Sequence, residues 1–303
     1  MFIIRNKKFF FVLSGFLIAL SLLLIFTKGL SFGIDFTGGS ILEVEYEGKR
    51  PEIISVKEKL DALALGAYRL QPLGEKSFIL RTRELNQTEK ETALKIFSAV
   101  GPEGRVAEKR FNTVGPVIGE ELKQKAFVAI LIVVTAIILF IAFSFRKVSK
   151  PVSSWKYGLV AIVALVHDIV IPTGFFVLLH ILSGVEIDIL FVTALLAILG
   201  FSVNDTIVVF DRIRENLNSN QERKIEEDFE KTVGRSLSQT FSRSVNTSLT
   251  TLLVLLSLFF LGGTATRYFA LALVIGVIFG TYSSIFLASP LLVWLAPTPV
   301  SEK

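Results

Sequence analysis

The sequence predicts a polytopic α-helical membrane protein that has six transmembrane helices and one small exported α+β domain. Three observations predict this fold class. Of the 303 residues, 51% are hydrophobic and only 19% are charged, and the mean hydropathy is +0.61. The charges are gathered in short stretches, and long apolar runs lie between them. One long stretch, residues 29–124, instead mixes charged and apolar residues throughout, as a water-soluble domain does.

The six spans follow from hydrophobic run length, because a membrane-spanning helix needs about 20 mostly apolar residues. The fifth run is short, and we expect it to extend back through the polar residues 242–247. The first run is too long for a signal peptide, and no small-residue cleavage site follows it. The predicted spans are Phe9–Thr27, Ala126–Phe145, Tyr157–Leu182, Ile189–Phe210, Ser248–Leu261 and Tyr268–Leu295.

The basic residues of the short loops predict the orientation of these spans, because cytoplasmic loops carry an excess of Lys and Arg. The N-terminus and the loops 146–156 and 211–245 are rich in both, whereas the short loops of the opposite side carry only Arg267. We therefore expect both termini to be cytoplasmic. The basic excess, with a sequence pI near 9.3, then reflects membrane topology and indicates no nucleic-acid partner.

The predicted division of the chain has four parts. Residues 1–28 form the first transmembrane helix, 29–124 a periplasmic domain, 125–296 a five-helix transmembrane region, and 297–303 a cytoplasmic tail. Within the third part, the cytoplasmic segment 212–243 mixes charged and apolar residues at helical spacing between residues 215 and 241. Such spacing is typical of an amphipathic helix that lies on the membrane surface.

The periplasmic domain shows the pattern of a small α+β unit. Alternating apolar and polar residues indicate strands, and Glu91 completes a capping-box pattern with Thr88. The order β-α-β-β-α-β is the ferredoxin-like arrangement. The predicted elements are a strand Ser40–Tyr46, a helix from Pro51 to about Leu65, strands Ala67–Leu73 and Ser77–Thr82, a helix from Thr88 to near Gly101, and a strand Val106–Val114.

Few residues are suited to catalysis or metal binding. The chain has no cysteine and two histidines, which removes disulfides, thiolate chemistry and the usual zinc and iron–sulfur ligand sets. The periplasmic domain has no His, no Cys and no clustered Asp pair. We therefore expect no cofactor, no metal and no enzymatic activity, and a role for this domain in contact with another macromolecule.

An ionisable side chain inside a span is expensive and is a functional hypothesis by default. Asp205 lies in the fourth predicted span and Arg243 at the start of the fifth. A carboxyl group there can be neutral when dehydrated and ionised when water or a cation reaches it, and Arg243 can hold it ionised if the two are close. The pair can therefore form a proton relay, or a static ion pair that fixes helix packing.

Four further polar residues lie within spans. His167 and Asp168 are adjacent in the third span, and Ser202 and Asn204 flank Asp205. They can extend a relay or serve as packing partners, and the sequence leaves both readings open. Pro172 can loosen the third helix. The repeat of small residues Gly276, Gly280 and Ser284 indicates close helix approach.

Three motifs resemble the SecD/SecF family of protein-export subunits, within the resistance–nodulation–division superfamily. The first is the run Phe32–Gly39 directly after the first span, with Asp35, Gly38 and Gly39. The second is the stretch from Gly200 to Asn216, and the third is Ser236–Ser248 with Leu261–Gly263 after it. The resemblance covers nearly the whole chain. One departure is Phe201, which stands where the family often has Tyr.

The resemblance implies a function. Members of this family assist the SecYEG channel in the bacterial cytoplasmic (inner) membrane and use the proton-motive force, or sodium in some relatives, to promote protein export. It implies SecD as a partner, YajC as a further candidate, unfolded exported proteins as clients, and Asp205 and Arg243 as relay residues. The alternatives are half of a lipid or small-molecule exporter, and a non-conducting assembly factor.

Overall fold

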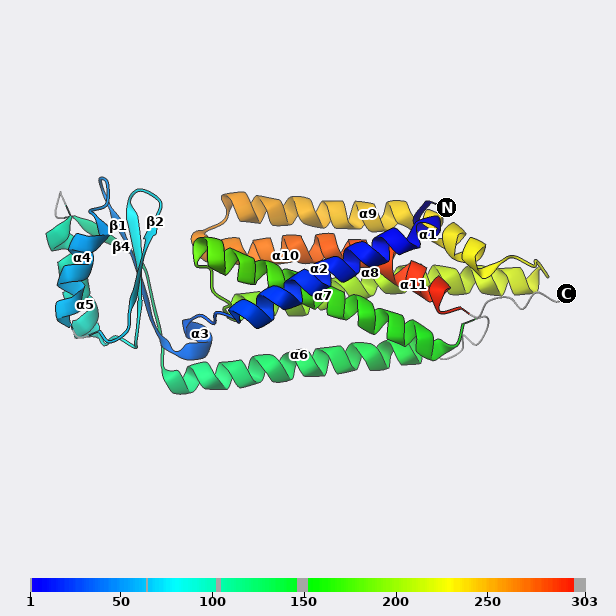
Figure 1. The fold of residues 1–303 in the computed structure, drawn as a ribbon, viewed down its shortest axis with the longest axis horizontal. Helices are drawn as coiled ribbons and strands as arrows, with labels where there is room; N and C mark the ends of the chain where they lie inside the picture. Colours follow the sequence, from blue (N-terminus) through cyan, green and yellow to red (C-terminus); the bar gives the residue numbers. More distant parts are fainter. Residues whose placement is uncertain (1, 64, 102–104, 146–151, 297–303) are drawn as a thin grey trace. The chain divides into compact units, whose positions relative to one another are not determined.

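The computed structural model describes residues 2–63, 65–101, 105–145 and 152–296. The expected basic cluster at 146–151 and the tail 297–303 lie outside these residues. The chain forms two compact units, one from residues 1–31 with 128–303 and one from Phe32–Phe127. Figure 1 shows the helices of the first unit and the sheet of the second.

In the described residues of the chain, six helical segments are long and apolar enough to cross a membrane. They lie close to the predicted spans, and the second and fifth extend further toward their N-termini. The last consists of α10, a π-helical segment and α11. The elements of this unit are α1 (Phe2–Arg5), α2 (Lys7–Lys28), α6 (Pro116–Ser144, shared with the second unit), α7 (Ser154–Ser183), α8 (Ile189–Glu222), α9 (Phe229–Leu261), α10 (Thr264–Tyr282), η2 (Ser283–Ala288) and α11 (Ser289–Trp294).

The prediction of an amphipathic helix lying on the membrane surface over 215–241 is wrong. Helices α8 and α9 continue into this segment and meet at a turn, 223–228, in which Lys224 has a φ of 54°. The Asn216 amide donates hydrogen bonds to Ser236 Oγ and Gln239 Oε1, each 2.8 Å long. The apolar face, including Val233, packs into the protein core rather than on lipid.

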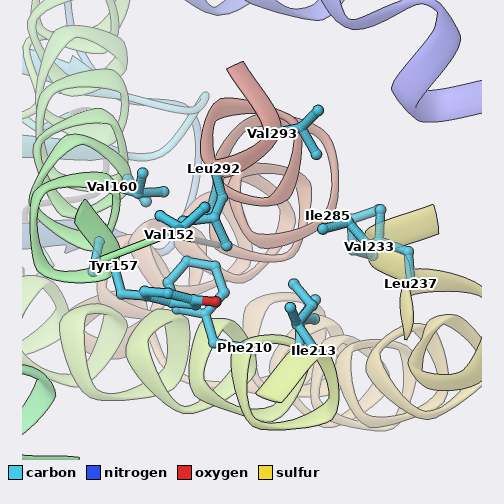
Figure 2. Packing of buried hydrophobic residues seen from close by; sticks show 14 of the residues in the cluster. Val152, Tyr157, Val160, Phe210, Ile213, Val233, Leu237, Ile285, Leu292 and Val293 are labelled. Carbon is cyan, nitrogen blue, oxygen red and sulfur yellow. The ribbon is translucent and has the colours of Figure 1, made fainter. Parts of the chain in front are cut away.

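The core of the helical unit lies near the end that carries this hairpin, and Figure 2 shows its packing. The ring of Tyr157 stacks on Phe145 at 5.2 Å between centroids and meets Phe210 edge to face at 5.2 Å. All three side chains are fully buried. Ile285 and Leu292 bring the last span into the same cluster. This core therefore ties α6, α7, α8 and the C-terminal helices together.

The predicted small-residue repeat is a contact surface between the fourth and sixth spans. A Cβ on Gly276 would lie 2.1 Å from Ile198, and one on Gly280 would lie 3.2 Å from Ser202. Ser284 completes the repeat with a 2.8 Å hydrogen bond to Thr206. Each step of the repeat thus meets a residue of α8, which permits the close approach of the two helices.

The second unit has the predicted β-α-β-β-α-β order. Its described residues form one antiparallel sheet with strand order β2-β3-β1-β4, which is the ferredoxin-like topology. Helices α4 and α5 cover one face of the sheet (Figure 1), and Leu42, Phe78 and Phe97 are fully buried between the layers. The elements are α3 (Ile34–Thr37), β1 (Gly39–Tyr46), α4 (Ile53–Leu60), η1 (Asp61–Leu63), β2 (Arg69–Leu73), β3 (Ser77–Thr82), α5 (Gln87–Val100) and β4 (Val106–Val114).

Helix α5 starts one residue before the predicted Thr88, and its cap differs. Asn86 is the N-cap, its side chain accepts a hydrogen bond from the Glu89 amide, and Glu89 accepts one from the Asn86 amide. Asn is as good an N-cap as Asp or Ser. The capping box is therefore formed by Asn86 and Glu89, and not by Thr88 and Glu91.

Candidate functional site

Asp205 lies on α8 and is 8% exposed. Its Oδ2 atom is buried and has no hydrogen-bond partner among the described residues. The side chain faces Ser244 on α9, and the Ser244 hydroxyl is likewise buried and without a hydrogen bond in the described part of the chain. A buried carboxylate oxygen without a partner is costly unless a proton or a cation reaches it.

Arg243 is exposed on α9. Its charge acts on Asp205 of the neighbouring helix α8. Within the described residues, the salt bridges of 4.0 Å or less do not include this pair. The structure therefore places the two predicted relay residues on neighbouring helices without a closed ion pair.

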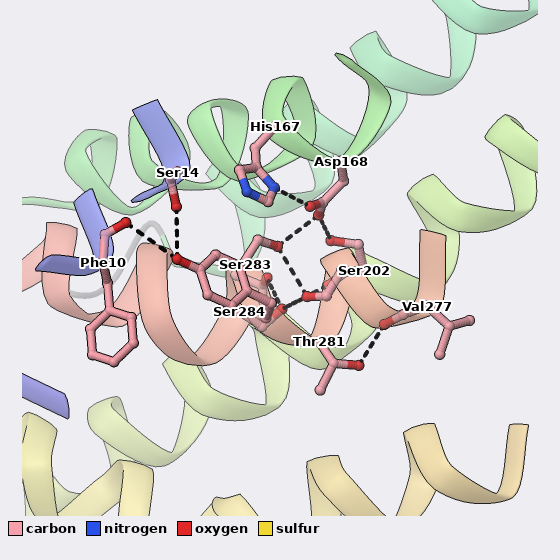
Figure 3. Close-up of polar contacts among 12 residues, drawn as sticks. Phe10, Ser14, His167, Asp168, Ser202, Val277, Thr281, Ser283 and Ser284 are labelled. Carbon is pink, nitrogen blue, oxygen red and sulfur yellow. Dashed lines mark hydrogen bonds and ion pairs between the residues drawn. The ribbon is translucent and has the colours of Figure 1, made fainter. Parts of the chain in front are cut away.

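A second carboxylate lies deeper in the same unit. His167 and Asp168 on α7 are fully buried, and His167 Nδ1 lies 2.8 Å from Asp168 Oδ1. Asp168 Oδ2 accepts hydrogen bonds from the hydroxyls of Ser202 on α8 and Ser283 on η2, the latter 2.8 Å long. Figure 3 shows these residues converging from three helical segments.

Further polar contacts surround this carboxylate. The His167 ring stacks on Tyr282 at 5.7 Å and an interplanar angle of 18°. The Ser14 hydroxyl donates to the Tyr282 hydroxyl, which donates in turn to the Phe10 carbonyl, at 3.1 and 3.2 Å (Figure 3). Nε2 of His167 is buried and has no hydrogen-bond partner in the described ranges. The network therefore reaches from α2 to α8 through the last span.

The other predicted residues take no part in the contacts just described. Asn204 is exposed on α8. Asp35 belongs to α3, and Gly38 and Gly39 belong to the junction between α3 and β1 in the second unit. A Cβ on Gly38 would lie 2.7 Å from Pro116 Cα, and one on Gly39 would lie 2.5 Å from the Thr82 carbonyl oxygen. Both glycines have positive φ, so their role here is close backbone packing.

Sequence reasoning missed three residues of the network, Ser14, Tyr282 and Ser283, and it did not single out Ser244, which faces Asp205. The polar run 282–284 inside an apolar span is a signal that could have pointed to two of them. Ser244 lies in the polar run 242–247 before the fifth predicted span. Ser14 is an isolated serine in the long helix α2, and only its contact with Tyr282 shows its part. No group of three or more His, Cys, Asp or Glu suited to a metal ion occurs among the residues that the structure describes.

Comparison with known proteins identifies the family. Residues 94–298 match protein export membrane protein SecD/SecF, C-terminal, and residues 23–49 match the SecD/SecF GG motif. The chain belongs to the SecD/SecF family of protein export membrane proteins. Within that family, the curated relatives that it matches are named protein translocase subunit SecF. Those from Thermobaculum terrenum and Magnetococcus marinus are 42% and 40% identical, over 96% and 98% of this chain and 92% of each relative.

Solved structures agree with the fold. The crystal structure of SecDF, a translocon-associated membrane protein, from Thermus thermophilus matches with a TM-score of 0.81 and 34% identity. SecDF in a super-membrane-facing form matches with a TM-score of 0.63 and 34% identity. In both cases 96% of this chain is covered, and this chain spans 38% of the SecDF chain. The protein is therefore a multi-pass membrane protein with the SecF fold, as the sequence predicted.

Proposed function

We propose that this chain is the SecF half of a SecDF-type complex in the bacterial cytoplasmic membrane, where it couples proton movement through its helices to protein export. SecD is its membrane partner, the SecYEG channel its site of action, YajC a further candidate partner, and an unfolded exported protein the client. Its role is mechanical, and no cofactor takes part.

The observation that carries this proposal is the state of Asp205. Its Oδ2 atom is buried and without a hydrogen bond within the described residues, and Arg243 lies outside ion-pair distance. A static ion pair would hold both groups in contact, because breaking a buried pair leaves an uncompensated charge. An open arrangement on adjacent helices instead suits a carboxyl group that takes up and releases an ion. This favours the relay over the assembly-factor reading.

The surface of the helical unit supports a membrane partner. Asn204 on α8 and Arg243, Asn246, Thr247 and Thr250 on α9 are exposed in this chain, although both helices are candidate spans. Polar and charged groups at membrane depth face protein or water rather than lipid. A SecD subunit that covers this face would satisfy them, and the SecDF chain has ample further length to supply one.

Contacts in the structure also support the predicted topology. Lys7, at the start of α2, lies 3.4 Å from Glu230 of the α8–α9 hairpin. The Lys156 ammonium group donates a 2.7 Å hydrogen bond to the Leu295 carbonyl at the end of the last span. The start of α2 thus meets the hairpin, and the first turn of α7 meets the end of the last span. This pairing is consistent with two cytoplasmic termini.

The test is export in cells that carry Asp205→Asn at normal expression together with SecD. We expect proton-driven export to fall about tenfold or more, which corresponds to about 1.4 kcal/mol of lost coupling, while the complex stays inserted. Asp211→Asn is the matched control, because Asp211 lies on the same helix, is exposed and pairs with Arg214 at 2.6 Å. Its export should match that of the wild type.

Normal export in Asp205→Asn would overturn the proposal. If export is normal but resistance to small molecules or lipid composition changes, the exporter reading gains support instead. Loss of the inserted complex in Asp205→Asn would indicate that the carboxylate fixes helix packing.

A further inference from the structure

The negative charge of an ionised Asp168 would be buried, and the proposed relay residues Asp205 and Arg243 do not balance it. Its side chain is fully buried, and in the described residues the only titratable group that contacts it is His167. The other contacts are hydroxyls, from Ser202 on α8 and Ser283 on η2. Hydroxyl groups can satisfy the hydrogen bonds of a carboxylate, but they cannot neutralise its charge.

A carboxylate beside a neutral imidazole would leave a full negative charge in an apolar bundle, which is expensive. One additional proton removes this cost, whether it resides on the imidazole or on the carboxyl group. The geometry accepts it in either place, because His167 Nδ1 and Asp168 Oδ1 are 2.8 Å apart. Tyr282 also stacks against the ring at 5.7 Å, where an aromatic face can stabilise a cation.

The two helices that flank Asp168 are loosened at this depth. Pro172 lies inside α7 and has no backbone N–H. The backbone carbonyl of Asp168 therefore lacks the helical hydrogen bond that residue 172 would otherwise donate. Ser283 begins the π-helical segment η2, and such segments often occur at functional sites. The backbone of α7 and of η2, on either side of the Asp168 carboxylate, can therefore change its hydrogen bonding at small cost.

The carboxylate is linked to Asp205 through α8. Ser202, which donates to Asp168, precedes Asp205 by three residues, about one helical turn, and Thr206 next to Asp205 bonds Ser284 of η2 at 2.8 Å. One turn of α8 thus contacts both carboxylate sites and the π-helical segment. A change in the hydrogen bonds of Asp168 therefore shifts this turn of α8, and with it the position of Asp205.

We propose that the His167–Asp168 pair is a second proton-holding site, and that its proton controls the packing of η2 against α7 and α8 beside Asp205. When the proton leaves, the uncompensated carboxylate draws water or a cation into the bundle, and these compete with the hydroxyls of Ser202 and Ser283 for the carboxylate oxygens. This inference rests on the proposed function, because it adds a second station to the same proton path.

The direct test is spectroscopic and needs no transport. The chain has two histidines, so His180→Asn leaves His167 as the only histidine of this chain, and labelling this chain alone allows isotope-edited NMR in the purified complex with unlabelled SecD. Infrared spectroscopy of the same sample reports a protonated buried carboxyl group. At neutral pH we expect either a doubly protonated His167 ring or a protonated carboxyl signal, and Asp168→Asn should remove whichever is present. A neutral ring beside an ionised carboxylate would overturn the proposal.

The functional test compares Asp168→Asn with Ser248→Ala. Ser248 and Thr281 also form a partly buried hydrogen bond between spans, 2.5 Å long, but no carboxylate takes part. We expect Asp168→Asn to lower proton-driven export about tenfold, and Ser248→Ala to change it by less than about twofold. If Asp205→Asn abolishes export while Asp168→Asn behaves as wild type, the second site is wrong and the proposed function stands. If both behave as wild type, both are wrong.

Discussion

At the residue scale, the contacts of single small side chains set how closely the spans approach. The sequence indicated this for Gly276, Gly280 and Ser284, because their spacing of four places them on one helix face. It also pointed to Asp205, because the cost of a carboxyl group in a bilayer can be read from its neighbours in the chain. It could not join Asp168 to Ser283, since 115 positions separate them and only packing brings them together.

Gly276→Ala should destabilise the helical unit. The new Cβ would lie 2.1 Å from Cγ1 and 2.2 Å from Cδ1 of Ile198, so α8 and α10 must separate or Ile198 must leave its rotamer. Overpacking of this kind costs about 1–3 kcal/mol, which a thermal unfolding midpoint in detergent would report. Ile198→Ala in the same chain should restore part of the loss.

Gly200→Ala is the control for this substitution. Gly200 lies in α8 with nothing within 4 Å of its Cβ position, and alanine is the better helix former by about 1 kcal/mol. Its midpoint should stay or rise. Equal midpoints for the two variants would contradict the packing explanation.

At the scale of elements, the α8–α9 hairpin is the clearest difference from the sequence prediction. Helical periodicity over 215–241 was recognised, but periodicity alone does not say whether an apolar face meets lipid or protein. Val233 and Leu237 are buried in the core, and the polar residues between the helices bond one another. The bounds of the strands were easier to predict, because alternation and turn residues are local signals.

The end of this hairpin should be sensitive to acid. Glu227 accepts hydrogen bonds from Asn220 at 2.9 Å and from Thr232 and Arg235 at 2.8 Å. The Asn220 bond contributes most to holding the pKa of Glu227 below its ordinary value of 4.5, and Thr232 and the charges of Arg235 and Lys231 act in the same direction. The resulting stabilisation is fully present above pH 4.5 and is lost as the pH falls through the folded-state pKa.

Hydrogen exchange of amides at the α8–α9 turn would measure this effect after correction for intrinsic rates. We expect protection to fall on acidification, and Glu227→Gln to lower it at neutral pH by about 1 kcal/mol or less, because the group is partly solvated. Glu226→Gln, at the exposed neighbouring position, should leave protection unchanged. A pH response that persists in Glu227→Gln would assign it to another group.

At the scale of the whole molecule, the two predicted parts, a helical region and an inserted α+β domain, are both present. Amino-acid composition is enough to predict this division, because hydropathy is averaged over long windows and a single atypical residue changes the average little. The chain leaves and re-enters the helical unit through two short segments that pack together inside the second unit. Gly119 of α6 approaches Gly38, where a Cβ on Gly119 would lie 2.8 Å from the Gly38 nitrogen.

Gly38→Ala should disturb this junction more than an ordinary glycine substitution. Gly38 has a φ of 72°, and its Cβ would lie 2.7 Å from Pro116 Cα, a backbone atom that cannot rotate away. Gly74→Ala is the matched control, because Gly74 has a φ of 60° with nothing within 4 Å. Positive φ costs a residue with a Cβ about 1–3 kcal/mol in either variant, and overpacking should add about 1–3 kcal/mol to Gly38→Ala alone.

Limited proteolysis of the full chain would compare the two variants. We expect faster cleavage of the second unit in Gly38→Ala than in Gly74→Ala. Equal rates would mean that the close approach to Pro116 contributes nothing beyond backbone strain.

The single residue Gly115 between the end of β4 and the start of α6 limits how the chain can change its length. An added residue there would shift Pro116 and Gly119 relative to β4, and would disturb the close contacts of these two residues with Gly38. Residues 223–226 of the turn between α8 and α9 are exposed and have no such restriction. Fusion of a fluorescent protein or an epitope therefore belongs at this turn, and natural insertions in the family should gather there.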